Sequence, residues 1–493
     1  MNAVSNINRP VSKKVLFVNI PHASRLSHVS KIVADIHFPI GLAYIMNSVS
    51  SQCQGYDFDL LDLNFYANDE QSIKKYFSEN YKYNSLPDFV LFGAMSTNYL
   101  QVKNISRILK SLFPSIKLVC GGTIAKIHSQ FLLEKLGLDI CVIGEGEETV
   151  VELLKCPKKL STINGIAFLD KDGYVKTPMR GRVERIQSLI PVYRYFNMEG
   201  YISARKYSQG FRGFMVSGSR GCYYKCEFCH RPFGNEIKYR PVEEIVGEIS
   251  YLVKTYKLEY FSLCDELPWS SKKWMSELAT CLIDNRIKVM WIAGGRVNQF
   301  SYKDRDLLRL AKKAGLVRIG FGVESASKKI LQNMKKVGVS PERTKETFRL
   351  LRKIGIKPSA AIVMGFPGET PETIQETVDF LKENLLVMRS FFILQPYPGT
   401  EVYEKYVKDK VSEEDWLENY SHDGDASKLT VNLTNMTDEE FMLNIKEGAK
   451  QVCKRSLLYY FKYYPLRDLP RQILIDIFRY IRMKVTGAYF ETP

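Results

Sequence analysis

Two patterns of apolar residues alternate along the first third of the chain. Short runs rich in β-branched and aromatic residues, such as Lys14–Ile20 and Phe89–Gly93, have the length of strands buried on both faces of a parallel sheet. Apolar residues at helical spacing lie between such runs, for example from about Tyr99 to Phe113. Further strands are expected at Phe58–Asp62, Lys117–Cys120 and Ile140–Ile143, and further helices near Gly41–Asn47 and Phe131. The alternation predicts an N-terminal, Rossmann-like, doubly wound α/β domain over residues 12–155.

The same alternation returns over residues 209–400 as six strand–helix units. Strands are expected at 214–217, 260–263, 289–293, 317–323, 359–364 and 390–395. Six such units predict a partial (β/α)6 barrel of the TIM type, whose chemistry belongs at the carboxyl ends of its strands. Residues 156–208 lose the alternation and are expected to form a linker with a small hairpin from Gly165–Phe168 and Gly173–Lys176. Residues 401–493 are expected to be helical, with helix starts near 413 and 438.

Composition places the chain among ordinary globular proteins. Its 493 residues are 45% hydrophobic and 25% charged, which suits two or three domains with their own cores. The start of the sequence has no apolar run typical of a signal peptide, and no window approaches eighteen uninterrupted apolar residues. A cytoplasmic location is therefore expected. The net charge of +16 suits an anionic partner such as a nucleic acid, a phospholipid surface or a phosphorylated substrate, but solubility explains it equally well.

Three cysteines follow the spacing C-x3-C-x2-C at Cys222, Cys226 and Cys229. Three thiolates on one loop can each bind one iron of a [4Fe–4S] cluster, and the fourth iron then has no protein ligand. Most electron-transfer clusters use four cysteines, so the missing ligand favours a reactive cluster over an electron relay. A zinc site with His230 as fourth ligand is the alternative, although zinc sites usually have closer cysteine spacing.

The cysteine motif, with an aromatic residue before its last cysteine and a strand-like run at 214–217 before it, resembles the radical SAM superfamily. This resemblance implies that the open iron chelates S-adenosylmethionine (SAM) and that reduction cleaves SAM to a 5'-deoxyadenosyl radical. It also implies an external electron donor such as flavodoxin or ferredoxin. Residues at the ends of the later strands, together with the aromatic residue of the motif, would bind SAM: Asp265 and Glu266 its amino group, Arg296, Glu324 and Ser325 its ribose and carboxylate, and Phe228, Gly365 and Gly368 its adenine.

Small and polar residues follow the strands of the first domain, where backbone amides can approach a ligand. They are Ser96, Thr97, Gly121, Gly122, Gly144, Glu145 and Gly146. In this order, and ahead of a radical SAM motif, they resemble the cobalamin-binding domain of the B12-dependent radical SAM class, which implies that they bind cobalamin. The Asp-x-His-x-x-Gly motif of many B12 domains is absent, because His22, His28, His37 and His128 all lie outside such a frame. Cobalamin would then bind with no histidine on its lower face.

A related radical SAM type, the methylthiotransferases, binds a second cluster through three cysteines of its first domain. Cys53, Cys120, Cys141 and Cys156 supply enough cysteines. Because Cys120 and Cys141 fall on or beside predicted core strands, we interpret them as small buried apolar residues instead.

The resemblance implies a cobalamin-dependent radical SAM methyltransferase that acts on an unactivated carbon of a lipid or other small molecule such as a secondary metabolite. A cyclase or oxidoreductase on the same scaffold is the second hypothesis. A nucleic-acid-binding protein with a structural cluster is disfavoured, because no RNA-binding module is found. Basic and apolar residues mix at helical spacing in 454–464 and 471–484, which suits either a membrane interface or packing against the barrel.

Overall fold

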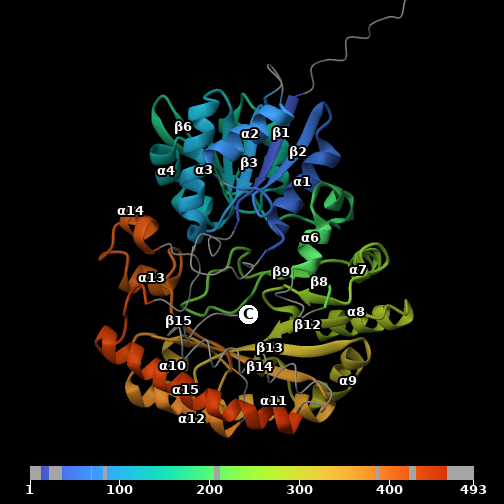
Figure 1. The fold of residues 1–493 in the computed structure, drawn as a ribbon, viewed down its shortest axis with the longest axis vertical. Coiled ribbons are helices and arrows are strands. Elements are labelled where there is room, and N and C mark those ends of the chain that lie inside the picture. Colours follow the sequence, from blue (N-terminus) through green and yellow to red (C-terminus); the bar gives the residue numbers. More distant parts are fainter. Residues whose placement is uncertain are drawn as a thin grey trace, which may run out of the picture. The chain divides into compact units, whose positions relative to one another are not determined.

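The computed structural model describes residues 13–21, 36–67, 69–81, 86–204, 211–384, 388–420 and 429–463. The chain folds as two compact units (Figure 1). Unit 1 comprises residues 1–201 and 413–424, and unit 2 comprises residues 202–412 and 425–493.

Unit 1 is built on a seven-stranded sheet with the order β2-β1-β3-β4-β5-β6-β7. The first five strands pair in parallel: β2 (Tyr56–Asp62), β1 (Lys13–Asn19), β3 (Phe89–Gly93), β4 (Lys117–Gly121) and β5 (Ile140–Val142). The expected hairpin is present as β6 (Ile166–Asp170) and β7 (Gly173–Lys176). Because β6 pairs antiparallel with β5, the hairpin extends this sheet rather than standing apart from it.

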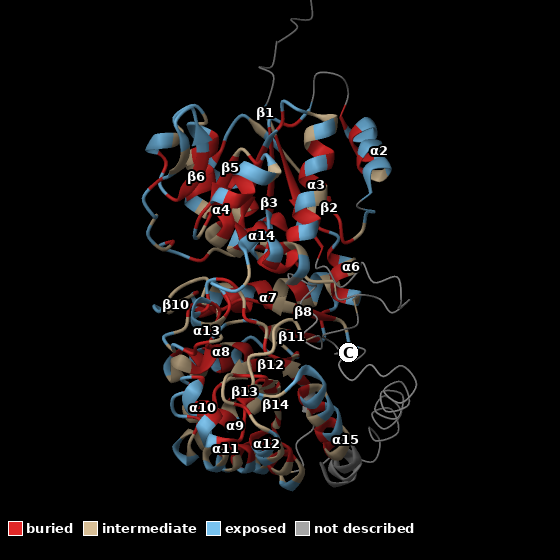
Figure 2. Ribbon diagram, turned by 90° about the vertical axis from the view of Figure 1, so that its left-hand side faces the viewer, coloured by how far each residue is buried: buried red, intermediate tan, exposed pale blue. Residues whose placement is uncertain are grey.

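Helices cover the sheet of unit 1 and bury its apolar strands (Figures 1 and 2). In one layer α1 (Ile40–Gln52) contacts α5 (Glu147–Lys155). In another, α3 (Tyr99–Leu112) contacts both α2 (Glu70–Asn80) and α4 (Gly122–Leu136). A short helix, α6 (Met198–Ser203), follows the 3-10 turn at Ile190–Tyr195. This arrangement confirms the doubly wound α/β domain predicted from the alternation.

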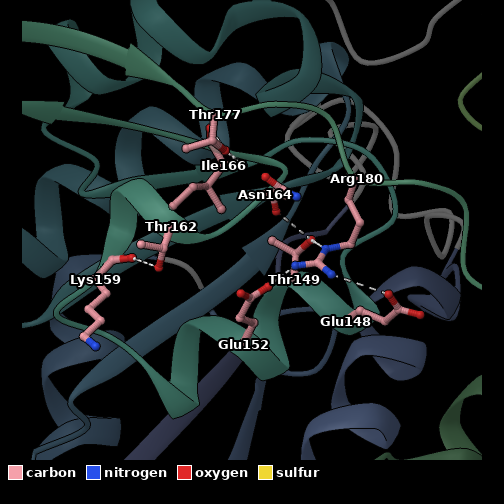
Figure 3. Close-up of polar contacts among 9 residues, drawn as sticks. All are labelled: Glu148, Thr149, Glu152, Lys159, Thr162, Asn164, Ile166, Thr177 and Arg180. Atoms are coloured by element: carbon pink, nitrogen blue, oxygen red, sulfur yellow. Dashed lines mark hydrogen bonds and ion pairs between the residues drawn. The ribbon is translucent and has the colours of Figure 1, made fainter.

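Residues just after the hairpin are fastened to α5 (Figure 3). The Arg180 guanidinium donates a hydrogen bond to Thr149 Oγ1 at 3.0 Å and forms ion pairs with Glu148 and Glu152. Thr177 closes the hairpin through hydrogen bonds with both the amide and the carbonyl of Ile166. Residues 166–180 of the segment that the sequence suggested as a linker are therefore bound to the sheet of unit 1 and to α5.

Unit 2 contains six parallel strands that follow one another in chain order. They are β8 (Gly213–Val216), β11 (Tyr260–Leu263), β12 (Met290–Gly295), β13 (Leu316–Glu324), β14 (Lys357–Met364) and β15 (Met388–Ile393). The sheet is open, since β8 and β15 are its two edges among the described residues. This confirms the partial barrel predicted from the six strand–helix units.

Successive helices of unit 2 pack side by side along the barrel. They are α7 (Val242–Tyr256), α8 (Lys272–Asp284), α9 (Arg305–Lys313), α11 (Pro341–Ile354) and α12 (Pro371–Glu383). Two shorter helices, α10 (Lys328–Asn333) and α13 (Glu401–Tyr406), follow β13 and β15. The long α15 (Asp438–Tyr463) contacts α12 and β15.

The C-terminal region divides between the two units. The helical turns α14 (Glu413–Asp415) and Trp416–Tyr420 belong to unit 1, where Trp416 and Leu417 are buried. The helix starts expected near 413 and 438 are both present. The basic, apolar stretch at 471–484 lies outside the described residues, as do the side chains of 454–464. In the part of the chain that is described, no helix combines the length and apolar character needed to cross a membrane.

Candidate functional site

A closed loop carries the three motif cysteines of unit 2. The two-residue strand β9 (Ser219–Arg220) pairs antiparallel with β10 (Lys238–Tyr239), which brackets residues 221–237 just beyond the carboxyl end of β8. Inside the loop the amide of Cys222 donates to the carbonyl of Gly234 at 3.2 Å, and the amide of Cys229 donates to the carbonyl of Cys226 at 3.1 Å. The loop therefore has its own backbone hydrogen bonds.

The three thiols lie close enough for the charge of one to shift the pKa of another. Loss of solvation is the main cause that raises the pKa of Cys222, and it raises the pKa of Cys229 to about 11, with a further contribution from Cys226. Among the described residues, no three side chains of His, Cys, Asp or Glu, His230 included, converge closely enough to hold a metal ion. The donor set nevertheless suits a [4Fe–4S] cluster, since it offers three soft thiolate ligands on one loop.

Asp265 and Glu266, which follow β11, both hold the start of the cysteine loop. The Asp265 carboxylate accepts hydrogen bonds from the Gly218 amide at 2.7 Å and the Ser219 hydroxyl at 2.8 Å. Glu266 accepts one from the Gly221 amide at 2.5 Å. Desolvation raises the pKa of Asp265 to about 6, although these hydrogen bonds oppose the shift. The structure thus brings the two acids to the loop that carries the cysteines.

The ends of β12 and β13 place charged side chains beside this loop. Arg296, which follows β12, lies with Nη1 3.2 Å from Cys226 Sγ. Glu324 ends β13 with a φ of +65° and pairs with Lys336 Nζ at 2.6 Å, with both side chains buried. Ser325 is also buried, and its hydroxyl accepts a hydrogen bond from the amide of Ser327.

The turn after β14 is built on two glycines. Gly365 and Gly368 have φ values of +93° and +89°, which other residues rarely adopt. The Gly365 amide donates to the carboxylate of Glu369, which is fully buried, and this burial raises the pKa of Glu369 to about 7. Phe228 packs against a buried apolar cluster of Ile330, Met334, Phe366, Leu394 and Val402. All the residues expected to bind SAM thus lie on the cysteine loop or at the carboxyl ends of β11 to β14.

The carboxyl edge of the unit 1 sheet gathers the residues expected at cobalamin. In the order β2-β1-β3-β4-β5 the strand order reverses between β1 and β3, because β2 is added on one side of β1 and β3 to β5 are added on the other; ligands of such parallel sheets bind at this point. Ser96 and Thr97 form a 3-10 turn after β3, and Gly144 follows β5. Gly122, the first residue of α4, has a φ of +84°, and a Cβ there would lie 2.3 Å from the carbonyl oxygen of Ala94. Glycine therefore allows the loops after β3 and β4 to touch.

Two features of this edge fit a ligand with both polar and apolar groups, such as cobalamin. Thr97 Oγ1 and both amide atoms of Gln101 are buried without a hydrogen-bonding partner among the described residues. Met95 and Met179, which lie beside these loops, are exposed apolar side chains. Exposed apolar surface rimmed by polar groups is typical of a ligand site.

Two polar residues of unit 1 that could have bound a ligand form hydrogen bonds with other residues of the protein. The Glu145 carboxylate accepts hydrogen bonds from Arg182 Nε and the Val183 amide, both at 2.9 Å. His128 is buried in α4, with Nδ1 2.5 Å from Glu413 Oε1. His22 and His28 lie outside the described residues.

The comparisons with known proteins match both units in chain order. The model of the radical SAM superfamily matches residues 216–381, and the model of the B12 binding domain matches residues 29–154. The chain thus carries a radical SAM domain and a B12-binding domain. A radical SAM enzyme of this kind uses a [4Fe–4S] cluster, SAM and cobalamin.

Individual relatives of this radical SAM enzyme extend over most of its length. An uncharacterized methyltransferase of Pyrococcus horikoshii is 26% identical over 475 residues, 95% of each chain. The anaerobic magnesium-protoporphyrin IX monomethyl ester cyclase of Cereibacter sphaeroides is 29% identical over 339 residues, 66% of this chain and 54% of the cyclase. The radical SAM methyltransferase TsrM of Kitasatospora setae shares the fold, with a TM-score of 0.64 at 21% identity over 79% of this chain and 75% of TsrM.

Three of the four cysteines of unit 1 are buried. Cys120 and Cys141 are neighbours in the register of β4 and β5 and are fully buried, which confirms their interpretation as buried core residues. Cys53 is also buried, whereas Cys156 is exposed. Burial raises the pKa of Cys141 to about 12, so its thiol stays protonated.

Sequence reasoning missed Glu227, which lies between the second and third motif cysteines. Its side chain is buried and forms ion pairs with Lys335 and Lys405, while its backbone bonds to Met334 and Val402. The position inside the motif was the available signal, since an acid there has no role in holding iron. Its partners come from α13 and the loop after α10, which the sequence pattern alone could not bring together.

Proposed function

We propose that this radical SAM enzyme transfers a methyl group to an unactivated carbon of a small molecule, a lipid or secondary metabolite. The observation that carries the proposal is the pairing of a three-cysteine loop with a B12-binding domain on one chain. The end-to-end match to a methyltransferase supports transfer of a methyl group in particular. We also propose a cytoplasmic location and an external electron donor such as a flavodoxin or ferredoxin, because a reducible cluster needs both a reducing compartment and a reductant.

In this proposal each cofactor has its own set of residues. Cys222, Cys226 and Cys229 would hold the cluster, and the carboxyl edge of the unit 1 sheet would hold cobalamin. Together the cofactors supply a methyl donor and the reductive cleavage of SAM that activates a C–H bond. The protein positions them, and its own residues decide which substrate enters.

The residues at the strand ends of unit 2 have two tasks in this proposal. Asp265 and Glu266 accept hydrogen bonds from backbone amides at the start of the cysteine loop, which fixes that end of the loop at the carboxyl end of β11. Glu324, Ser325 and the glycine turn Gly365–Glu369 would bind SAM beside that loop, as the resemblance implies. Phe228 would contribute an apolar face for the adenine, since it already packs in an apolar cluster.

A cyclase is the second candidate, and one relative favours it. Magnesium-protoporphyrin IX monomethyl ester cyclase is 29% identical over two thirds of this chain, although the match spans about half of the cyclase. A ring-forming enzyme would cleave SAM without using it as a methyl donor. The fate of the SAM methyl group therefore separates the two functions.

The experiment requires no knowledge of the substrate. The cluster is reconstituted anaerobically, cobalamin is added, and the ultraviolet–visible spectrum is recorded before SAM with a labelled methyl group and a reductant are supplied. Methyl transfer predicts label in the corrinoid and formation of S-adenosylhomocysteine. Cluster chemistry predicts 5'-deoxyadenosine, which must disappear in Cys226→Ala.

Each outcome has a distinct meaning. Retained cobalamin with 5'-deoxyadenosine but no S-adenosylhomocysteine would support the cyclase and overturn the methyltransferase. SAM cleavage without retained cobalamin would overturn the role of unit 1. Cys281→Ala is the matched control, because Cys281 lies in α8 away from the motif and its loss should leave every readout unchanged.

A further inference from the structure

The guanidinium of Arg296 contacts a motif cysteine directly. Its Nη1 lies 3.2 Å from Cys226 Sγ, a hydrogen-bond distance for a sulfur acceptor, and Arg296 is only 7% exposed. We expected from the sequence that Arg296 would reach SAM, because it ends the third strand of the barrel. The structure places this side chain against the cysteine loop.

Two further contacts fix the guanidinium in this position. Its Nη2 donates to the Val337 carbonyl at 2.8 Å, and its plane lies over the ring of Tyr224, with the guanidinium carbon 3.7 Å from the ring centroid. Tyr224 is held in turn, because its hydroxyl accepts a hydrogen bond from Asn298 Nδ2 at 2.8 Å. Such a stacked and hydrogen-bonded guanidinium is pre-organised, so little entropy is lost in keeping it against the sulfur.

The charge of Arg296 is not neutralised locally. In the part of the chain that is described, no carboxylate lies within ion-pair distance of it, whereas Lys336, the other cation that acts on these thiols, is paired with Glu324. Glu266 is the carboxylate that acts on Cys222 in the opposite sense. Arginine also keeps its proton in proteins, so this positive charge is permanent.

A permanent cation that donates to a ligand sulfur has a defined effect on an iron–sulfur cluster. Reduction adds one electron, and therefore one negative charge, to a cluster that three thiolates already make electron-rich. A hydrogen bond to the sulfur and a nearby positive charge both stabilise the reduced form more than the oxidised form. Because the guanidinium is buried, solvent screens this interaction only weakly.

We propose that Arg296 raises the reduction potential of the cluster bound by Cys222, Cys226 and Cys229, and that Tyr224 and Asn298 position it to do so. The inference rests on the proposed function, which supplies the cluster. The electron comes from an external one-electron donor, which is oxidised as the cluster is reduced. Arg296 thereby makes the cluster easier for that donor to reduce.

The test compares reduction potentials of reconstituted, SAM-free enzyme, measured by electron paramagnetic resonance at fixed potentials. Arg296→Gln should shift the reduction equilibrium at least tenfold toward the oxidised cluster, which is about 59 mV for a one-electron couple. Arg296→Lys keeps the charge but loses the planar fork, so a smaller shift is expected. Arg309→Gln is the control, since Arg309 is an exposed residue of α9 and its replacement should leave the potential unchanged.

Tyr224→Leu gives an independent readout. This variant keeps the arginine at position 296 but removes the aromatic ring that positions its guanidinium. A downward shift smaller than that of Arg296→Gln is expected, and this variant decides the question if Arg296→Gln retains no cluster. An unchanged potential in variants with full iron content would overturn the proposal. Weakened SAM binding at an unchanged potential would return Arg296 to the role expected from the sequence. A wild-type protein that assembles no [4Fe–4S] cluster would instead contradict the proposed function.

Discussion

A Cβ atom on Gly221 would lie 2.0 Å from the carbonyl oxygen of Glu236. Gly221 has a φ of +108°, in a region that other residues avoid, and it is the first residue of the cysteine loop. Gly221→Ala therefore introduces both a backbone strain of about 1–3 kcal/mol and a clash with the main chain. We expect the variant to lose most of its cluster, measured as iron and sulfide per chain after anaerobic reconstitution.

Gly234 provides a matched control in the same loop. It also has a positive φ, +73°, but a Cβ there meets nothing within 4 Å. Gly234→Ala carries only the conformational strain and should retain much more of the cluster. Equal cluster content in the two alanine variants would show that the contact with Glu236 does not shape the loop.

The buried pair of Lys336 and Glu324 leads to a prediction about stability. Lys336 Nζ lies 2.6 Å from Glu324 Oε1, and the side chains of Lys336 and Glu324 are 6% and 8% exposed. Lys336→Met leaves the Glu324 carboxylate buried without its partner, which should cost about 3–5 kcal/mol. The double variant Lys336→Met, Glu324→Gln should recover part of this loss, because no unpaired charge remains.

The measurement is thermal unfolding of the cofactor-free protein. Lys328→Met is the control, since Lys328 pairs with Glu342 at 3.0 Å with side chains 72% and 62% exposed, and such pairs contribute about 0–1 kcal/mol. A loss in Lys336→Met no larger than that in Lys328→Met would mean that water reaches Glu324.

Glu369 should make the stability depend on pH. Burial raises the pKa of this carboxyl to about 7 from an ordinary value of 4.5. Between these values the folded protein binds more protons than the unfolded chain, so stability falls as pH rises from 4.5 to 7. The difference of about 2.5 pKa units corresponds to about 3 kcal/mol.

Glu369→Gln has no proton to lose, so its thermal midpoint relative to wild type should rise as pH increases through this window. At pH below 4.5 the two proteins should be similar. Glu372→Gln is the control, because the pKa of the exposed Glu372 is lowered and its removal should give no such rise. A difference between Glu369→Gln and wild type that does not change with pH would contradict a protonated Glu369.

Much of this architecture was predictable because parallel strands leave strong local signals. The runs at 89–93 and 260–263 match β3 and β11 residue for residue, since strands buried on both faces are almost continuously apolar. The spacing of the cysteines likewise identified the loop that carries them. These features depend on residues that are near neighbours in the sequence.

Features that depend on distant residues were not predictable. The hairpin at 166–176 looks like an isolated element until β6 pairs with β5. Residues 413–420 fold with unit 1, where Glu418 accepts a hydrogen bond from the hydroxyl of Tyr99, 319 residues away. Similarly, the strand-end position of Arg296 suggested SAM as its partner, and only the folded loop reveals Cys226 beside it.

The two unsatisfied amide atoms of Gln101 give the most direct test of a ligand at unit 1. Gln101 lies in the first turn of α3 and is 3% exposed, and neither its Oε1 nor its Nε2 finds a partner among the described residues. A buried amide without hydrogen bonds costs about 1–3 kcal/mol, so Gln101→Leu should raise the thermal midpoint of the cobalamin-free protein.

If the Gln101 amide forms hydrogen bonds with cobalamin, the same variant should bind cobalamin at least tenfold more weakly, measured from the corrinoid spectrum. Ser106→Ala is the control, because Ser106 Oγ is also buried without a partner among the described residues but lies about one and a half turns further along α3. Its replacement should stabilise the protein and leave cobalamin binding intact. Equal cobalamin binding by wild type and Gln101→Leu would show that this amide does not bind the corrinoid. Weaker binding by the more stable variant would show that it does, because loss of stability could not then explain the weaker binding.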